Sequence, residues 1–374
     1  MVVLAAAVSE AAPLTPAQAV DIARQIDNLS VFDYATRTIA ARQLRRAPST
    51  EVVPALVAAV RGHSDQFVRY RALVILTSFE ARETPDLMRS LLRDRNDRVR
   101  EVVYRWFERH PDPGLRAMLL AALETEQAEF VRPALVRAIA ALPPDDLVQR
   151  TLISEVGRGF DFFRGAVIEA LGERRAVYAA DAIASVAALD GPLQDDAVLA
   201  LGRIGDTRVS TLSSIEKPSP DVAAAIRAAE CLLTSDCGAH IDWLTATARN
   251  PAARPDAIRA ATGALAIIAQ EHPAARGALL HLGGIAAARI REEAALALSA
   301  LALRRSDETM AWFVGAASEE QARAIELLRD GFEQLEEDFA EEQFFAAARA
   351  AYWTADEGSP ARGAAATLID ALGF

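Results

Sequence analysis

The chain has 374 residues, of which 52% are hydrophobic, 25% charged and 6% aromatic, so general disorder is excluded. Acidic residues outnumber basic ones 52 to 40, a formal net charge of −12, which argues against a protein that coats nucleic acid. Two cysteines exclude a disulfide-rich scaffold or a cysteine-rich zinc module, and no run approaches the ~18 apolar residues of a membrane-spanning helix.

Residues 1–14 are expected to form an N-terminal tail ahead of the first helix. The tail opens with the apolar run MVVLAAAV, which lacks the basic segment that begins an export signal. We therefore expect a cytoplasmic protein. One alternative stays open: if Met1 is not the true start, the run is the remnant of a signal peptide and the protein is exported.

From residue 15 to residue 374 the chain repeats about every 32 residues. Each copy has an apolar helix, a polar turn and a second helix, as in residues 51–60 followed by 67–76, with apolar residues at the i, i+3, i+4 and i+7 positions of a helix. This pattern predicts an all-α fold, a single continuous α-solenoid of about eleven antiparallel helix pairs. An arginine after an apolar residue marks the second helices, and Arg37, which follows Thr36, fits the same spacing. We call these residues the grid arginines: Arg37, Arg69, Arg100, Arg132, Arg164, Arg259, Arg291 and Arg323.

Acidic residues precede most grid arginines by three or four positions. In the first turn of a helix, a carboxylate caps free N–H groups and can pair with the arginine. Because they recur once per repeat, these acids indicate a structural ladder rather than a catalytic one. They are Asp33, Asp65, Asp97, Glu129, Asp161, Asp256 and Glu320.

The repeat is interrupted, and charge is unevenly distributed along it. The arginine is missing near Ala197 and Ala223, so we expect a bend within residues 204–250. Residues 306–345 hold twelve acids and two arginines, whereas residues 35–116 hold sixteen arginines and ten acids. The array is therefore basic near its start and acidic near its end. Either these are solvated helix faces, or they are surfaces that steer charged partners.

Second helices of the form Asp-x-x-Val-Arg, as at residues 65–69, resemble those of HEAT repeats. Residues 168–172 and 200–206 are similar to the phycobilisome-lyase-type class of HEAT-like repeats. The resemblance implies a superhelix whose second helices line a concave surface. It leaves function open, because the family includes scaffolds, adaptors and a few enzymes.

No catalytic, cofactor or metal site is predicted from the sequence. The glycines at 157–159 and 283–284 lack the context of a phosphate-binding loop. Cys231 and Cys237, near His240 and Asp242, form the one local cluster of metal-ligating types. Buried free thiols are the favoured interpretation, with a disulfide and a metal site as alternatives.

The sequence thus predicts a monomeric, non-enzymatic scaffold or adaptor that binds a protein or peptide on its concave face. Arg71, Arg105 and Arg137 are predicted to form a basic inner stripe that meets an acidic partner segment. Trp106 is either core between repeats or an anchor for the partner. One alternative, implied by the resemblance, is a lyase or isomerase acting on a bilin-like chromophore. Another is nucleic-acid binding through the basic first third.

Overall fold

The computed structural model describes residues 21–79, 81–212, 214–234, 236–335 and 338–374; the predicted tail over residues 1–14 lies outside these ranges. Within them the chain forms 22 α-helices and short 3-10 turns, with no strand, so the predicted all-α solenoid is confirmed. The first helices of the pairs are α1 (Ile22–Asp27), α3 (Ser49–Gly62), α5 (Thr84–Leu91), α7 (Arg116–Thr125), α9 (Asp146–Glu155), α11 (Ala180–Ala187), α13 (Val209–Leu212), α15 (Gly238–Arg249), α17 (Pro273–Gly283), α19 (Ser306–Gly315) and α21 (Asp338–Thr354). The second helices are α2 (Tyr34–Arg46), α4 (Gln66–Leu76), α6 (Asp97–Arg109), α8 (Arg132–Ala140), α10 (Asp161–Glu173), α12 (Gln194–Ile204), α14 (Pro220–Leu233), α16 (Pro255–Ile268), α18 (Ala288–Arg304), α20 (Ser318–Leu335) and α22 (Pro360–Ala371).

Helix starts follow the chemistry of their first residues. Asp33 accepts a hydrogen bond from the backbone N–H of Thr36 and caps α2, and Asp65 caps α4 in the same way through the N–H of Phe67. Prolines occupy the first turns of several helices, among them α14 and α16, where a missing N–H costs nothing. Local capping therefore sets where the repeats begin.

Second helices pack directly on one another, and glycine permits the closest approaches. A Cβ at Gly172 of α10 would lie 2.8 Å from the Cα of Ala200, and a Cβ at Gly202 of α12 would lie 2.6 Å from the Cα of Ala229. Both distances are shorter than any ordinary carbon contact. The spacing of α10, α12 and α14 therefore depends on the absence of side chains at these two positions.

Replacing Gly202 with alanine is expected to lower the free energy of unfolding by about 1–2 kcal/mol, because two helix backbones must move apart. Gly263 of α16 is the matched control, since a Cβ there meets nothing within 4 Å. Alanine at position 263 should raise stability by about 0.5–1 kcal/mol through helix propensity. Chemical denaturation of both variants measures the difference, and equal effects would contradict the close-packing argument.

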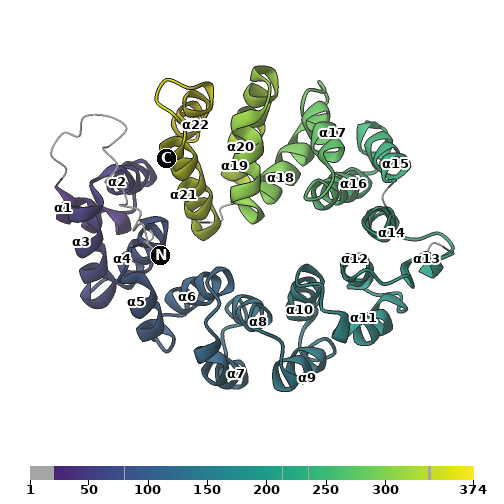
Figure 1. The fold of residues 1–374 in the computed structure, drawn as a ribbon, viewed down its shortest axis with the longest axis horizontal. Coiled ribbons are helices and arrows are strands. Elements are labelled where there is room, and N and C mark those ends of the chain that lie inside the picture. The colour runs from purple at the N-terminus through teal and green to yellow at the C-terminus, as the bar shows by residue number, and fades with distance from the viewer. Residues whose placement is uncertain (1–20, 80, 213, 235, 336–337) are drawn as a thin grey trace, which may run out of the picture.

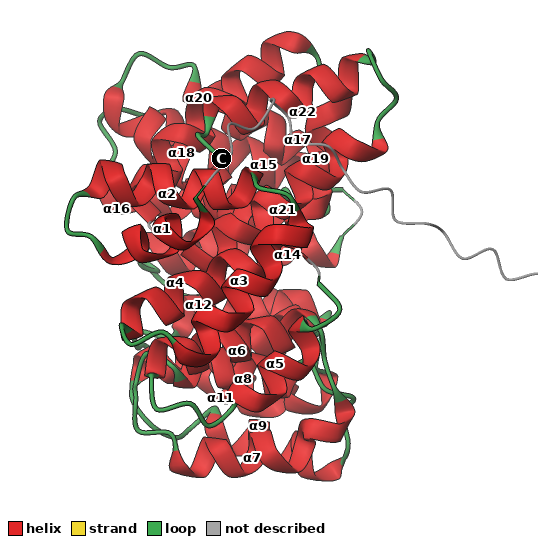
Figure 2. Ribbon diagram, turned by 90° about the vertical axis from the view of Figure 1, so that its left-hand side faces the viewer, coloured by secondary structure: helices red, strands yellow, loops and turns green. Residues whose placement is uncertain are grey.

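The array curls until its two ends meet (Figures 1 and 2). Figure 1 shows the second helices from α4 to α18 on the inside of a ring and the first helices from α5 to α17 on the outside. At the left of that view, α2 and α4 lie next to α21 and α22. The start and the end of the chain are therefore neighbours in space.

The apolar core has two parts that divide at α14. Val222 and Ala225 of this helix belong to the first part, whereas Ala224 and Ala228 belong to the second. The preceding helix α13 has only four residues. The bend expected within residues 204–250 stays a prediction. Phe339 of α21 joins the first core across the meeting point of the two ends.

Candidate interaction surface

The three arginines predicted to form a basic inner stripe lie on successive inner helices, and each is engaged by an acid of the same chain. Arg71 of α4 pairs with Asp338 at 2.5 Å, and Arg105 of α6 pairs with Glu101 at 3.0 Å. Arg137 of α8 pairs with carboxylates of α10. Their side chains remain partly exposed, between 20% and 30%. Their role in partner binding stays a prediction.

The two ends of the array are joined by ion pairs between α21 and the first repeats. Glu342 of α21 pairs with Arg45 of α2, whose Nε donates to Oε1 over 2.6 Å; only 1% of the glutamate side chain is exposed. Asp338 at the start of α21 accepts a hydrogen bond from the Tyr70 hydroxyl over 2.9 Å and pairs with Arg71. Burial and the Asp338 carboxylate raise the pKa of Tyr70, so this hydroxyl remains a donor at physiological pH.

We call the place where the two ends of the array meet the junction. Along α21 it also includes contacts with uncharged groups of the first repeats. The amide of Gln343 donates to the Thr77 hydroxyl over 3.0 Å, and both groups are buried. Further along the helix, Arg349 donates to the carbonyl of Ser78, and its guanidinium lies 4.9 Å from the ring centroid of Phe79. Residues 77–79 form the 3-10 turn η2 (Thr77–Phe79), so α21 contacts α2, α4 and this turn.

The C-terminal residues complete the junction. Arg46 donates from Nε to the backbone oxygen of Phe374 over 2.7 Å and pairs with Asp370 at 2.9 Å. The guanidinium of Arg45 lies 5.7 Å from the centroid of the Phe374 ring. Basic residues of the first third of the chain therefore pair with acidic residues of its last part. The uneven distribution of charge along the sequence thus helps to hold the two ends together.

A second set of ion pairs crosses the ring; we call Arg137, Glu169, Glu173 and Arg304 the central cluster. Arg304 at the end of α18 pairs with both glutamates of α10, which also pair with Arg137. Burial alone would raise the pKa of Glu169. The charges of Arg304 and Arg137 outweigh that effect and lower the pKa to about 2. The central cluster thus holds opposite walls of the ring together.

A cavity of about 620 Å³ lies beside the central cluster, between α6, α8 and α10 on one wall and α18 to α21 on the other. Arg137 and Arg304 line it together with the partly exposed aromatic rings of Phe130 and Phe162. Because the arginines and carboxylates around it alternate, the cavity is polar with an aromatic edge.

Asp196, in the first turn of α12, lies close to the central cluster. Burial and the neighbouring charges of Asp195 and Glu169 raise its pKa to about 7, and Arg203 opposes them only partly. An acid whose pKa is higher in the folded state binds an extra proton on folding, so it reduces stability as the pH rises from about 4 to about 7.

Asp196→Asn is therefore expected to stabilise the protein at pH 8 by about 1 kcal/mol, and to change its stability at pH 4 very little. Denaturation at both pH values measures the contrast. The matched control is Asp190→Asn, which removes an exposed carboxylate just before α12. A gain of equal size at pH 4 would contradict the assigned pKa.

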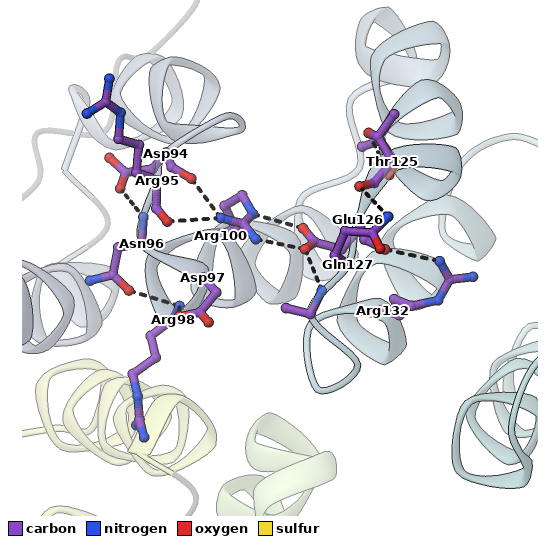
Figure 3. A network of polar contacts seen from close by, with 12 residues as sticks. Asp94, Arg95, Asn96, Asp97, Arg98, Arg100, Thr125, Glu126, Gln127 and Arg132 are labelled. Atoms are coloured by element: carbon purple, nitrogen blue, oxygen red, sulfur yellow. Dashed lines mark hydrogen bonds and ion pairs between the residues drawn. The ribbon is translucent and has the colours of Figure 1, made fainter.

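Grid arginines connect one repeat to the next (Figure 3). Arg100 donates to the backbone oxygen of Asp94, in the turn after the first helix of its own pair, over 2.8 Å. It also forms two hydrogen bonds with Glu126, at the end of the next first helix, over 2.8 and 2.7 Å. Burial raises the pKa of Glu126, but the hydrogen bonds from Arg100 and from the N–H of Ala128 outweigh it and hold the pKa below its ordinary value.

The same arrangement occurs on both sides of Arg100. Arg69 donates to the carbonyl of Val60 and pairs with Asp94, and Arg132 donates to the carbonyl of Leu123 and lies 3.7 Å from Glu155. Sequence reasoning expected pairing with the preceding capping acid, which occurs for Arg164 and Asp161 at 2.9 Å. The acids in the next repeat were missed. Their signal was a recurrence of their own, once per repeat: Asp94, Glu126 and Glu155.

The remaining grid arginines have more local contacts. Arg37 donates to the carbonyls of Val31 and Phe32. Arg259 lies 3.7 Å from Asp221 of α14. Arg164 donates a hydrogen bond to a carbonyl at the end of α9. Arg323 pairs with Glu326 in its own helix, and the side chain of Arg291 is exposed.

Trp106, the candidate aromatic anchor, lies in α6 and is only 7% exposed. Its ring stacks on His110 with centroids 4.2 Å apart and meets Phe107 edge to face. Little of the ring is left for a partner, and its role as an anchor stays a prediction. Phe130 and Phe162, at 44% and 69% exposed, present more aromatic surface to the cavity.

The structure joins Cys231 and Cys237 by a disulfide, with Cα atoms 4.8 Å apart, so the favoured expectation of free thiols is wrong. The turn between α14 and α15 brings the two residues together, as the geometry of a disulfide requires. His272 lies close to both sulfur atoms, whereas His240 and Asp242 are not part of this group. The sulfur atoms are bonded to each other and are not available as thiolate ligands.

Thiol titration of the denatured, unreduced protein is expected to find no free thiol. Reducing the bond should lower the free energy of unfolding by about 2 kcal/mol, the value for closure of a short loop. A Cys231→Ser, Cys237→Ser variant serves as the control, because its stability should not respond to a reductant. Two free thiols in the unreduced protein would contradict the disulfide.

The protein is therefore a solenoid of helical repeats whose two ends are joined by ion pairs. Residues 22–107 match the family model for HEAT repeats, and the arginine grid continues the same pattern along the chain. The chain is a HEAT-like α-solenoid, and the match to HEAT repeats themselves covers residues 22–107. None of the described helices is both long and apolar enough to cross a membrane.

Several solved structures are similar at low identity. Importin beta crystallised with ammonium sulfate is 14% identical, with a TM-score of 0.38 over 94% of this chain and 55% of that one. Kap121p is 14% identical, with a TM-score of 0.33 over 93% of this chain and 36% of that one. Importin beta crystallised with polyethylene glycol is 14% identical, with a TM-score of 0.32 over 94% and 60%. The chain thus spans between about a third and three fifths of these proteins. A search of curated proteins finds no match.

Proposed function

We propose that this protein is a non-enzymatic scaffold that binds an acidic protein or peptide segment through the basic inner wall formed by α2, α4, α6 and α8. A HEAT-repeat solenoid is a fold suited to protein–protein interaction, because stacked helix pairs present an extended, continuous surface. Arg71, Arg105 and Arg137, whose side chains stay between 20% and 30% exposed, are the candidate donors of this surface.

One observation carries the proposal: an acidic helix already rests on this wall. Asp338 and Glu342 of α21 pair with Arg71 and Arg45, although the partners are separated by more than 260 residues along the chain. The wall therefore has the geometry and charge to hold carboxylates presented by a helix. A partner helix of similar chemistry would meet the same donors.

The arrangement also favours a protein partner over nucleic acid. Arg45, Arg46 and Arg71 are paired with Glu342, Asp370 and Asp338, so part of the basic surface of the first third is neutralised by the chain itself. A phosphate backbone carries a charge at every nucleotide and would have to displace all of these carboxylates, whereas a short acidic helix needs only the two positions that Asp338 and Glu342 fill.

Selection from a random peptide library against the immobilised full-length chain tests the proposal. We expect the selected peptides to be rich in aspartate and glutamate. Charge reversal by Arg71→Glu and Arg105→Glu should lower their association rate and its salt dependence, with helix content unchanged. The matched control is Arg61→Glu with Arg249→Glu, which reverses two exposed charges on first helices. Selection of neutral or basic peptides, or equal binding by both double variants, would contradict the proposal.

A further inference from the structure

Where the two ends of the array meet, α21 occupies a surface of the first repeats. We define the junction surface as Arg45 of α2, Tyr70 and Arg71 of α4, and Thr77, Ser78 and Phe79 of η2. We propose that it is the docking site for an acidic amphipathic helix of a partner protein, and that α21 occupies it as an internal competitor until the ring opens. This inference rests on the proposed scaffold function and names the partner and its regulation.

The face that α21 presents to the junction surface has the spacing of a helical recognition element. Asp338, Glu342 and Arg349 stand at i, i+4 and i+11, on one side of the helix. The first two pair with arginines, and the guanidinium of the last lies over the rings of Phe79 and Phe345. A partner helix would thus need two carboxylates one turn apart.

Phe339 adds the apolar part of the contact. It is 7% exposed and belongs to the apolar core of residues 26–229 rather than to that of its own end of the chain. Gln343, one turn further on, donates to Thr77 inside the same interface. The junction surface therefore binds a helix through two ion pairs, one aromatic ring and one side-chain amide.

One buried polar atom of α21 has no hydrogen-bond partner in the described part of this interface. Glu342 is buried, yet its Oε2 atom accepts no hydrogen bond among the described residues, while Oε1 receives the contact from Arg45. A buried carboxylate oxygen without a donor costs free energy, so α21 binds this surface less tightly than the surface permits. A partner carboxylate that keeps one oxygen in water avoids that cost.

Opening the junction does not require unfolding of a repeat. The contacts of α21 with α2, α4 and η2 join the two ends of the chain without a covalent connection. On its other side α21 packs against α19 and α22 and remains attached to the C-terminal array. Because each repeat of a solenoid depends only on its neighbours, separation of the ends withdraws Phe339 from the first core but leaves the stacking of the repeats in place.

A fluorescent peptide with the sequence of α21, residues 338–354, is the probe. Three full-length proteins are compared: the natural sequence, the variant Asp338→Asn with Glu342→Gln, and the control Glu319→Gln with Glu320→Gln, which removes two exposed charges in α20. The junction variant should bind the peptide at least tenfold more tightly than the other two proteins. A peptide carrying the same two amide substitutions should not bind, and salt should weaken the interaction.

Solution scattering of the same samples reports whether the ring is open. We expect a larger radius of gyration for the junction variant only. An open ring that does not bind the peptide overturns the docking site, while the scaffold proposal still stands on its own peptide selection. A ring that stays closed, with peptide affinity unchanged, shows that α21 is a permanent part of the fold and overturns the competition. A dimer assigns the surface to a second copy of the chain and overturns the partner. If the double variant fails to fold, Asp338→Asn alone is subjected to the same measurements.

Discussion

Arg45→Ala is expected to lower the free energy of unfolding by about 4 kcal/mol and to separate the two ends of the ring. The reason is the burial of its partner: the Glu342 side chain is 1% exposed and the Arg45 side chain 12%. Removing one member of a buried ion pair leaves a charge without compensation in a low-dielectric environment. Chemical denaturation measures the loss of stability, and solution scattering measures the separation.

A double-mutant cycle with Glu342→Gln isolates this pair. Once Glu342 is neutral, loss of Arg45 should cost about 1 kcal/mol, chiefly for its packing on Phe374. Arg42→Ala is the surface control, because Arg42 is 41% exposed and lies 3.9 Å from Asp370. Its effect should stay below about 1 kcal/mol. Equal costs for the two arginines would show that the junction is not a buried pair.

The contacts at the junction could not be predicted from the sequence, although the basic and the acidic segments that form them are both visible in it. The excess of arginine in residues 35–116 and of acids in residues 306–345 is a fact of composition. Whether the two meet depends on small rotations between successive repeats, which add up over the whole array and have no local sequence signature. The pairing of Arg71 with Asp338 therefore appears only in the folded chain.

The helical repeats themselves were predictable, because their causes are local. Apolar spacing, capping acids such as Asp33 and Asp65, and prolines in first turns set the helices one at a time. Asp94 and Glu126 were missed for a different reason. They follow the ends of first helices, where an acid gains nothing from the helix dipole, and each accepts a backbone N–H of its own turn together with the arginine of the preceding repeat.

The disulfide shows the limit of an argument from spacing. Cys231 and Cys237 flank a turn between two helices, which is compatible with buried thiols, a disulfide or a metal site. Only the position of the two Cα atoms, 4.8 Å apart, distinguishes a bonded pair from two separately buried thiols. This distance depends on how α14 and α15 pack against each other, which cannot be inferred from the sequence of either helix alone.

Arg304→Met is expected to lower the free energy of unfolding at pH 7 by about 3 kcal/mol, because Glu169 and Glu173 then share only Arg137. It should also change the response to acid. The pKa of Glu169 is lowered from 4.5 to about 2 in the folded protein. Its contribution to stability is therefore complete above pH 4.5 and is lost as the pH falls from 4.5 towards 2.

Without Arg304, the pKa of Glu169 should rise towards its ordinary value, so less stability remains to be lost below pH 4.5. Denaturation between pH 3 and pH 8 should show a steep acid loss for the natural protein and a shallower one for Arg304→Met. Glu169→Gln is the control for assignment, because it removes the titrating group and should flatten the profile in the same pH range. If Arg304→Met keeps the steep natural profile, the acid sensitivity belongs to other carboxylates, and the ion pairs across the ring do not hold its walls together.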